Sequence, residues 1–330
     1  MKERFPKPVL LALELTRHCR FHCAHCRIKT AAEVPNDGLT DKQWKKILKS
    51  IADYHKCTVV LTGGEPMERE DIYTLIKYAK GLGLRIMLAT CGYLIDEKSI
   101  YKLKRVGLSM LSFSIDGESP DTHDAIRKSD GSFDAVIKAA EFAREAKLPF
   151  QINSTISRIN IDQVNAIAQL AQNLGARCYN PFIFIPLSPG CEIAEQLLDP
   201  VEYETLLNRL LEMKLTMPIE IKVTCTPALA RVSHRSGAEK RVGISDNCLG
   251  KGFGFINFKG DVQVCGFLGL SAGNILDEKF KFKKIWEKSN VLNEICDSSN
   301  YISQCGVCDY RVICGPCRAR AYSICRLCRK

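Results

Sequence analysis

Cysteine content is the feature that most constrains how this chain can fold. Seventeen of the 330 residues are cysteine, and nine of them lie between Cys248 and Lys330. Three more occur together at Cys19, Cys23 and Cys26. An odd number of cysteines cannot form a complete disulfide framework, and a reducing compartment would not maintain one. Thiolates grouped in this way usually bind metal, so the sequence predicts two separate metal-binding regions.

The remaining composition is typical of a globular protein without membrane spans. With 46% hydrophobic and 25% charged residues, the chain has enough length for about two domains of roughly 150 residues each. Its longest uncharged apolar runs, such as Val9–Leu13, are strand-sized, whereas a membrane-spanning helix needs about 20 apolar residues. The first residues also lack the pattern of a signal peptide. We therefore expect a cytoplasmic protein with no membrane partner.

The net charge of +10 favours an anionic partner. Nucleic acid is not the expected partner, because the sequence has no helix-turn-helix, zinc-finger or aromatic-rich RNA-binding signature. An acidic electron carrier and a substrate that carries several carboxylates both fit this charge.

Short β-branched apolar runs alternate with stretches of helical periodicity from residue 9 onward, which is typical of a parallel α/β sheet. Consecutive parallel strands need such helical crossovers between them. The predicted strands are Val9–Leu15, Thr58–Leu61, Arg85–Ala89, Met110–Ile115, Phe150–Thr155 and Cys178–Phe184. The predicted helices are Asp41–Tyr54, Asp71–Gly81, Glu97–Val106, Phe133–Ala146 and Ile161–Leu174.

The alternation ends after Ile185, where proline and glycine interrupt residues 186–190. We expect three parts: a barrel over residues 1–190, a connecting segment over 191–247 and a cysteine-rich domain over 248–330. The tail is too rich in cysteine, glycine and arginine to build its own core, so metal ligation would supply its folding energy. The elements predicted in the second and third parts are a helix over Val201–Met213, a strand from Pro218, a hairpin of Gly254–Phe258 and Asp261–Cys265, and a helix near Phe280–Asn290.

The first cysteine group reads Cys19-x3-Cys23-x2-Cys26 and lies in the loop after the first predicted strand. Loops at the carboxyl ends of parallel strands build the active sites of α/β enzymes. Three cysteines on one loop can hold a [4Fe-4S] cluster and leave its fourth iron open to a cofactor. The alternative is a zinc ion completed by a neighbouring histidine, although zinc sites usually combine two separated ligand pairs.

Together with Thr62-Gly63-Gly64-Glu65-Pro66 after the second strand, this motif resembles the radical S-adenosylmethionine (SAM) enzyme superfamily. The resemblance implies a partial (βα)6 barrel and a [4Fe-4S] cluster whose open iron binds SAM. Reduction by flavodoxin or ferredoxin would lead to cleavage of SAM into a 5′-deoxyadenosyl radical that abstracts a substrate hydrogen. It also implies that the backbone of Gly63, Gly64, Glu65 and Pro66 lies close to the methionyl amino group of SAM.

Other positions match the SAM contacts of the same family. The resemblance implies that Ser114 and Asp116 bind the ribose hydroxyls, that Asn153 makes a polar contact and that Arg127 lies near the SAM carboxylate. His25 replaces an aromatic residue that often precedes the third cysteine, which implies packing near adenine. The plainer alternatives are helix caps for Ser114 and Asp116, a satisfied interior amide for Asn153 and a solvated helix residue for Arg127.

The C-terminal cysteines closely resemble the SPASM extension of radical SAM enzymes, which implies one or two auxiliary [4Fe-4S] clusters. A zinc knuckle is the alternative, but five residues separate the two Cys-x2-Cys pairs, fewer than the roughly 12 to 20 of familiar zinc sites. In the family arrangement, the first auxiliary cluster would bind Cys248, Cys265 and Cys317, with Cys225 as the candidate fourth ligand. The second would bind Cys305, Cys308 and Cys314, together with Cys325 or Cys328.

Several stretches, among them Ala89-Thr90-Cys91-Gly92 and Cys317-Arg318-Ala319-Arg320-Ala321-Tyr322, are similar to the heme-biosynthesis branch of the superfamily. That branch contains didecarboxysiroheme deacetylase and a coproheme decarboxylase. The similarity implies that acetate or carboxyl side chains are removed from an anionic, siroheme-derived tetrapyrrole. The segment Pro186–Gly190 lacks the arginine of the branch, and Cys225–Arg231 lacks its histidine and tyrosine, which leaves a changed substrate open.

Three other functions stay open at this point. The chain could be a SPASM maturase that crosslinks or epimerises a ribosomal peptide, an enzyme for another small molecule, or an iron–sulfur electron-transfer protein without catalysis. No catalytic acid or base is indicated, because the cofactor performs the difficult chemistry in this family. Cys91 lies beside the expected active-site face, whereas Cys57, Cys178, Cys191 and Cys296 are expected to be small buried hydrophobic residues.

Overall fold

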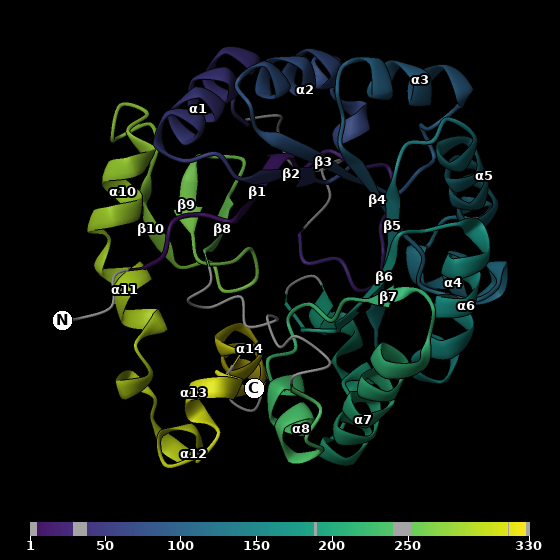
Figure 1. The fold of residues 1–330 in the computed structure, drawn as a ribbon, viewed down its shortest axis with the longest axis vertical. Helices are drawn as coiled ribbons and strands as arrows, with labels where there is room; N and C mark the ends of the chain where they lie inside the picture. The colour runs from purple at the N-terminus through teal and green to yellow at the C-terminus, as the bar shows by residue number, and fades with distance from the viewer. Residues whose placement is uncertain (1–4, 29–37, 188–189, 240–251, 316, 328–330) are drawn as a thin grey trace.

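The computed structural model describes residues 5–28, 38–187, 190–239, 252–315 and 317–327. Its strands form one ten-stranded sheet in the order β10-β9-β8-β1-β2-β3-β4-β5-β6-β7. Strands β1 to β7 are parallel, and the sheet curves with its helices on the outside (Figure 1). The strands are β1 Leu10–Thr16, β2 Thr58–Gly63, β3 Arg85–Thr90, β4 Met110–Ser114, β5 Phe150–Ile156, β6 Cys178–Ile183, β7 Glu220–Ile221, β8 Phe253–Ile256, β9 Asp261–Gln263 and β10 Ser271–Asn274.

Every barrel strand and helix predicted from the sequence is present, with ends that differ by at most three residues. The helix predicted over Ile161–Leu174 starts as a 3₁₀ turn, η2 Ile161–Gln163. The barrel helices are α1 Asp41–Tyr54, α2 Ile72–Gly81, α3 Glu97–Arg105, α4 Pro120–Arg127, α5 Ser132–Glu145 and α6 Val164–Leu174, with η1 Pro66–Glu68 after β2. The later helices are η3 Gly190–Gln196, α7 Pro200–Thr216, α8 Leu229–Arg235, α10 Phe282–Lys288, α11 Asn290–Cys296, η4 Ser298–Asn300, α12 Ser303–Gly306, α13 Arg311–Cys314 and α14 Arg318–Leu327.

The two faces of the sheet bury different side chains because strand residues point alternately to opposite sides. On the outer face, Phe113 and Ile152 are fully buried in the main core beneath the helices. On the inner face, Met87, Met110 and Cys178 form a small separate apolar cluster. Burial on both faces explains why these strands read as nearly continuous apolar runs.

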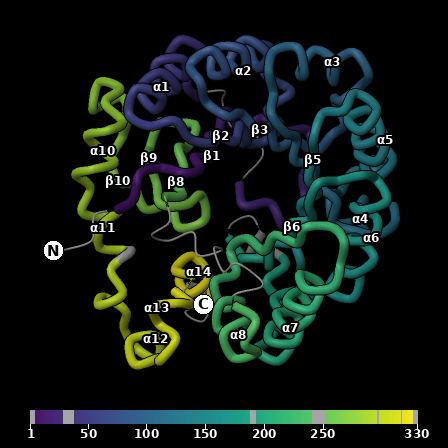
Figure 2. Tube along the Cα trace, in the orientation of Figure 1, coloured from purple at the N-terminus to yellow at the C-terminus, as the bar shows by residue number. Residues whose placement is uncertain are grey.

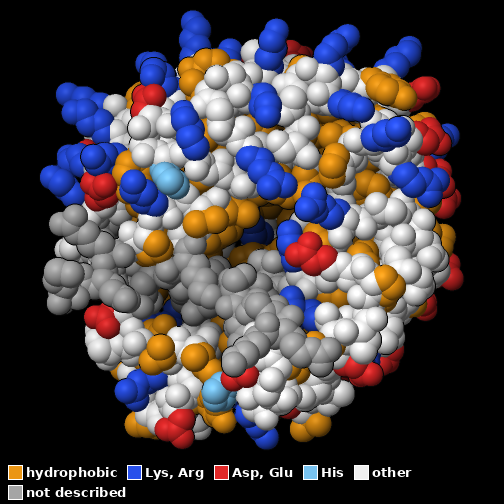
Figure 3. Space-filling view, in the orientation of Figure 1, with side chains coloured by type: hydrophobic (Ala, Val, Ile, Leu, Met, Phe, Trp, Pro, Cys, Tyr) orange, Lys and Arg blue, Asp and Glu red, His pale blue; other side chains and the backbone are white. Residues whose placement is uncertain are grey.

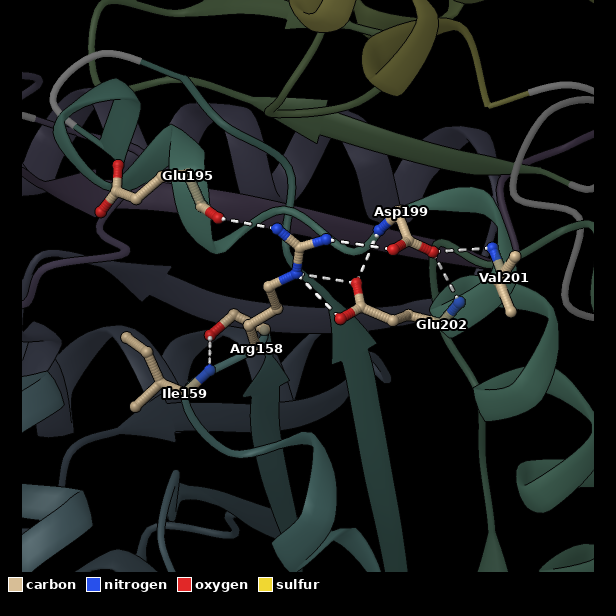
Figure 4. A network of polar contacts seen from close by, with 7 residues as sticks. Arg158, Ile159, Glu195, Asp199, Val201 and Glu202 are labelled. Carbon is tan, nitrogen blue, oxygen red and sulfur yellow. Dashed lines mark hydrogen bonds and ion pairs between the residues drawn. The ribbon is translucent and has the colours of Figure 1, made fainter.

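An ion-pair network ties the loop after β5 to the start of α7 (Figure 4). Arg158 donates from Nε to both carboxylate oxygens of Glu202, at 2.9 and 2.8 Å, and from Nη2 to Asp199 at 3.2 Å. Asp199 also caps α7 by accepting from the backbone N–H groups of Val201 and Glu202, at 2.8 and 2.9 Å. The same acidic residues therefore start the helix and fix its position against the barrel.

The C-terminal hairpin extends the barrel sheet beyond β1, a position that the sequence did not indicate. Strand β8 pairs in parallel with β1, and β9 pairs antiparallel with β8 as predicted. A Cβ atom on Gly254 would lie 2.6 Å from the ring of Trp286, so this glycine lets α10 pack directly on β8. The indole N–H of Trp286 donates to the carbonyl oxygen of Pro6 at 2.9 Å.

Helix α14 connects the cysteine-rich tail to the other side of the barrel. Arg320 donates to the carbonyl oxygens of Ile183 and Phe184 at the end of β6, at 2.9 and 2.8 Å. Figure 2 shows α14 between α8 and the α11–α13 segment, at the open side of the curved sheet. The sequence did not predict α4, β10, α8 or the tail helices α11–α14. Within the described residues, no helix has both the length and the apolar character needed to cross a membrane.

Candidate active site

The first cysteine motif lies between β1 and α1, at the carboxyl ends of the parallel strands. Cys26 donates its backbone N–H to the carbonyl oxygen of Cys23 at 3.0 Å, which closes a turn. Ala24 donates to the carbonyl oxygen of Ile126 at 2.9 Å, so α4 supports the loop. Cys19, Cys23 and Cys26 are all half-buried, and none of them forms a disulfide. The loop therefore presents three free thiols beside the sheet.

The two glycines after β2 pack against the backbone of this cysteine loop. A Cβ atom on Gly63, where φ is +141°, would lie 2.2 Å from the carbonyl oxygen of Thr16. A Cβ atom on Gly64 would lie 2.1 Å from that of His18. The next residue, Glu65, donates its N–H to the same His18 oxygen at 2.8 Å. Glycine is thus required here by contact between two loops, while proximity to the SAM amino group stays a prediction.

We expect Gly64→Ala to displace the cysteine loop and to reduce iron binding, because the added methyl group meets backbone atoms that cannot rotate away. Overpacking of this kind costs about 1 to 3 kcal/mol. The measurement is iron and sulfide content after anaerobic reconstitution. Gly81→Ala is the matched control, since no heavy atom lies within 4 Å of a Cβ at that helical position. Wild-type iron content in Gly64→Ala would contradict the expectation.

Glu65 is fully buried and links the ends of β2 and β3. Its carboxylate accepts hydrogen bonds from the Thr90 hydroxyl at 2.9 Å and from the Cys91 N–H at 2.8 Å. The Cys91 thiol lies 2.9 Å from the same carboxylate. Burial raises the pKa of Glu65, and a hydrogen bond with Cys91 lowers the pKa of Cys19. Cys91 therefore lies in the site, as its position after β3 suggested.

Glu68, at the end of η1, was not identified from the sequence although it fixes the start of the cysteine loop. Its carboxylate pairs with the Nδ1 atom of His18 and accepts hydrogen bonds from the Tyr93 hydroxyl and, at 3.2 Å, from the Arg20 N–H. Pro66 starts this 3₁₀ turn and is itself buried. Glu68 follows the glycine motif closely, but its partners come from two other loops, which no local pattern reveals.

Asp116 and Arg127 form a buried ion pair next to Cys23. The Nη2 atom of Arg127 lies 2.6 Å from Oδ2 of Asp116, and its Nη1 atom donates to the Cys23 sulfur at 3.8 Å. The other Asp116 oxygen accepts the Thr155 N–H at 2.7 Å. Burial alone would raise the pKa of Asp116, but the positive charge of Arg127 and the hydrogen bond from Thr155 lower it overall. The structure excludes the alternatives of a helix cap for Asp116 and a solvated side chain for Arg127.

His25 completes this cluster, with its Nε2 atom 3.6 Å from Oδ2 of Asp116. Burial lowers the pKa of His25 to about 4, so the imidazole is neutral near pH 7. Its contact with adenine stays a prediction. Together, Cys23, His25, Asp116 and Arg127 show that the cysteine loop, β4 and α4 meet at one site.

Asn153 belongs to a layer of neutral polar side chains on the inner face of the sheet. It donates to the Ser112 hydroxyl at 2.7 Å, and its amide oxygen accepts from Gln151 at 2.9 Å and Asn180 at 3.1 Å. These bonds match the alternative of a satisfied interior amide. Ser114 lies half-buried on β4 in register with Asn153. Their contacts with SAM stay predictions.

The C-terminal cysteines that the structure describes fall into two groups. Burial raises the pKa of Cys265, and the nearby Cys317 adds to the effect. Burial likewise raises the pKa of Cys314 to about 11, with further contributions from Cys305 and Cys308. Cys225 has a left-handed backbone with φ of 59°, and Cys325 is exposed on α14. Cys248 and Cys328 lie outside the described residues; Cys57 and Cys178 are buried as predicted.

The fold and the site together define a parallel half barrel that presents one loop of three cysteines at the carboxyl ends of its strands. A model of the radical SAM superfamily matches residues 13–171. The chain is 36% identical over 327 residues to a Methanosarcina barkeri protein named AdoMet-dependent heme synthase, covering 96% of this chain and 93% of that protein. A protein of the same name from Oleidesulfovibrio alaskensis is 34% identical over 335 residues, covering 98% and 86%. The chain belongs to the radical SAM superfamily and is an enzyme.

A solved structure has the same fold. It is the crystal structure of Streptococcus suis SuiB bound to precursor peptide SuiA, with a TM-score of 0.77 over 98% of this chain and 73% of that one. The sequence identity is 17%, so the likeness concerns the fold alone.

The family implies SAM and a [4Fe-4S] cluster, and the first cysteine loop fits them. Burial raises the pKa of Cys26 and raises that of Cys23 to about 11, so their thiolates need positive charge nearby, which iron would provide. Within the described ranges, no three Cys, His, Asp or Glu side chains surround a point that would hold a single metal ion. His18 and His25 are instead paired with Glu68 and Asp116.

Proposed function

We propose that this enzyme removes carboxyl groups from the side chains of an iron tetrapyrrole in heme biosynthesis. The observation that carries this proposal is the 36% identity to a heme synthase over 93% of that protein's length. The match includes both the barrel and the cysteine-rich tail. When bound, SAM and the cluster would supply the radical that abstracts a substrate hydrogen.

The residues at the site support an anionic substrate. Arg17 stacks on the ring of Phe258, 4.2 Å from the ring centre, at the carboxyl end of β1. A guanidinium group at this edge could bind a carboxylate through charge-assisted hydrogen bonds. The layer around Asn153 offers neutral amide and hydroxyl groups. In this proposal the protein orients the tetrapyrrole, and the cofactor performs the chemistry.

We also propose two auxiliary clusters in the tail. The proximity of Cys265 to Cys317, and of Cys314 to Cys305 and Cys308, supports the predicted division of ligands. The first cluster would also use Cys248 and Cys225. The second would be completed by Cys325 or Cys328.

The electron donor in this proposal is a reduced flavodoxin or ferredoxin in the cytoplasm. Lysine and arginine side chains gather along the edge of the molecule formed by α1, α2 and α3 (Figure 3). Much of the net charge of +10 therefore lies on the outer helices. A basic surface of this kind favours encounter with an acidic carrier.

The test is anaerobic incubation of the reconstituted protein with SAM, a low-potential reductant and either coproheme or didecarboxysiroheme. We expect 5′-deoxyadenosine to form in step with loss of carbon dioxide from coproheme, scored by mass spectrometry. Loss of acetate from didecarboxysiroheme would instead establish the deacetylase reaction. Formation of 5′-deoxyadenosine with both tetrapyrroles unchanged would contradict the proposal and favour a peptide substrate, for which the fold of SuiB offers a precedent.

A further inference from the structure

The side chain of Arg27 connects the two loops that carry Cys26 and Cys265. Arg27 directly follows Cys26, and its Nη1 atom donates to the carbonyl oxygen of Gly266, the residue after Cys265, at 3.3 Å. Its guanidinium carbon lies 4.7 Å from the ring centre of Phe255 on β8. One side chain thus joins segments that are more than 200 residues apart in the sequence.

A buried carboxylate holds this guanidinium in place. The Nη2 atom of Arg27 donates to Oε1 of Glu14 at 2.9 Å, and Glu14 is fully buried on β1. The second carboxylate oxygen accepts the Phe258 N–H at 3.3 Å. A buried acid needs a paired cation, since an uncompensated charge in the interior is costly. Glu14 therefore prevents Arg27 from turning toward solvent.

The geometry places a fixed positive charge between two cysteine loops. Arg27 is the neighbour of Cys26 in the chain, and its guanidinium donates to the backbone next to Cys265, so its charge lies close to both loops. Thiolate-bound iron–sulfur clusters gain negative charge on reduction, and nearby charge and hydrogen bonds tune their potential. A partly desolvated guanidinium acts on such charge more strongly than a solvated one.

We propose that Arg27, held by Glu14, is a positioning residue that fixes the distance between the SAM-cluster loop and the Cys265 loop and stabilises the reduced clusters at both. The inference rests on the proposed function for its second cluster, the one bound through Cys265. Arg27 is not a ligand in this proposal; it acts on both cluster sites through its charge and through the distance that it sets between the two loops.

The test is a redox titration of reconstituted protein without substrate, followed by electron paramagnetic resonance. In Arg27→Gln we expect full iron content but, at a given potential, at least a tenfold lower ratio of reduced to oxidised cluster at both sites. For a one-electron couple this is a shift of about 59 mV to more negative potential. Arg27→Lys keeps the charge but not the two-sided bridge, so its potentials should lie between those of wild type and Arg27→Gln.

Arg69→Gln is the matched control. Arg69 also donates to a β1 carbonyl, that of Leu15 at 3.0 Å, and pairs with an acid, Asp71, at 2.6 Å, but it bridges no cysteine loop. The reduction potentials of the clusters in Arg69→Gln should equal those of wild type. Wild-type potentials in Arg27→Gln would overturn the inference, as would equal shifts in Arg27→Gln and Arg69→Gln.

If Arg27→Gln loses iron, the potentials of Arg27→Lys are compared with those of wild type instead. Unchanged potentials in Arg27→Lys would overturn the inference, and a shift to more negative potential would support it. A separate variant tests the underlying function. Cys265→Ala should lose the iron and the signal of one cluster. If Cys265→Ala keeps the full iron content and all cluster signals, the proposal of an auxiliary cluster at Cys265 is wrong, whatever the result with Arg27.

Discussion

Replacement of Cys23 by alanine should reduce 5′-deoxyadenosine formation to the level of a protein-free control. The [4Fe-4S] cluster of the radical SAM site depends on three thiolates, and Cys23 lies at the centre of the loop beside Arg127. With only Cys19 and Cys26 left, the loop would no longer hold the cluster that binds SAM. The measurement is chromatography of 5′-deoxyadenosine together with iron and sulfide analysis.

Cys57→Ala is the control for Cys23→Ala. Cys57 is buried and precedes β2 at the amino ends of the parallel strands, whereas the cysteine loop follows the carboxyl end of β1. Its removal should leave iron content and SAM cleavage unchanged, because the predicted ligands of this cluster lie at the other end of the strands. Wild-type cleavage of SAM by Cys23→Ala would refute the assignment of the cluster to this loop.

The second large effect is expected from Asp116→Asn. Asp116 is fully buried and pairs with Arg127, which is itself 9% exposed. Asparagine is nearly the same size but leaves the guanidinium without a counter-charge. Removing one partner of a buried ion pair costs about 3 to 5 kcal/mol. We expect the free energy of unfolding, measured by urea denaturation with circular dichroism, to fall by that amount.

Asp53→Asn provides the matched comparison at the surface. Asp53 pairs with Lys49 at 2.8 Å, but both side chains are about 60% exposed. An exposed pair contributes about 0 to 1 kcal/mol, so this variant should be close to wild type in stability. An equally small effect of Asp116→Asn would show that the Asp116–Arg127 pair is not desolvated in solution.

The local elements and the first metal site could be predicted from the sequence because their signals are local. Apolar periodicity predicted strands β1 to β6 and every barrel helix except α4 to within three residues. The cysteine spacing identified the first loop, since its three thiols lie within eight residues of one another. Family resemblance then pointed to radical SAM chemistry, which the similarity to heme synthases confirms at the level of the superfamily.

The contacts that arrange the site depend on residues far apart in the chain. Glu68 meets His18 and Tyr93 only because the ends of β1, β2 and β3 lie side by side. The sequence suggested a cofactor contact for Gly64, and the structure adds a neighbour that the sequence did not suggest, the backbone of His18. Neither pairing leaves a periodic pattern, because both arise from loop conformations.

The sequence by itself determined that this chain forms a parallel α/β barrel with two groups of cysteines, since periodicity and spacing are properties of neighbouring residues. Only the tertiary structure decided that β8 pairs with β1, which brings Arg27 to the Cys265 loop. It also decided that Asp116 and Arg127 neutralise each other. The physical reason is that burial converts such distant charges into obligatory partners, and burial is a property of the folded chain.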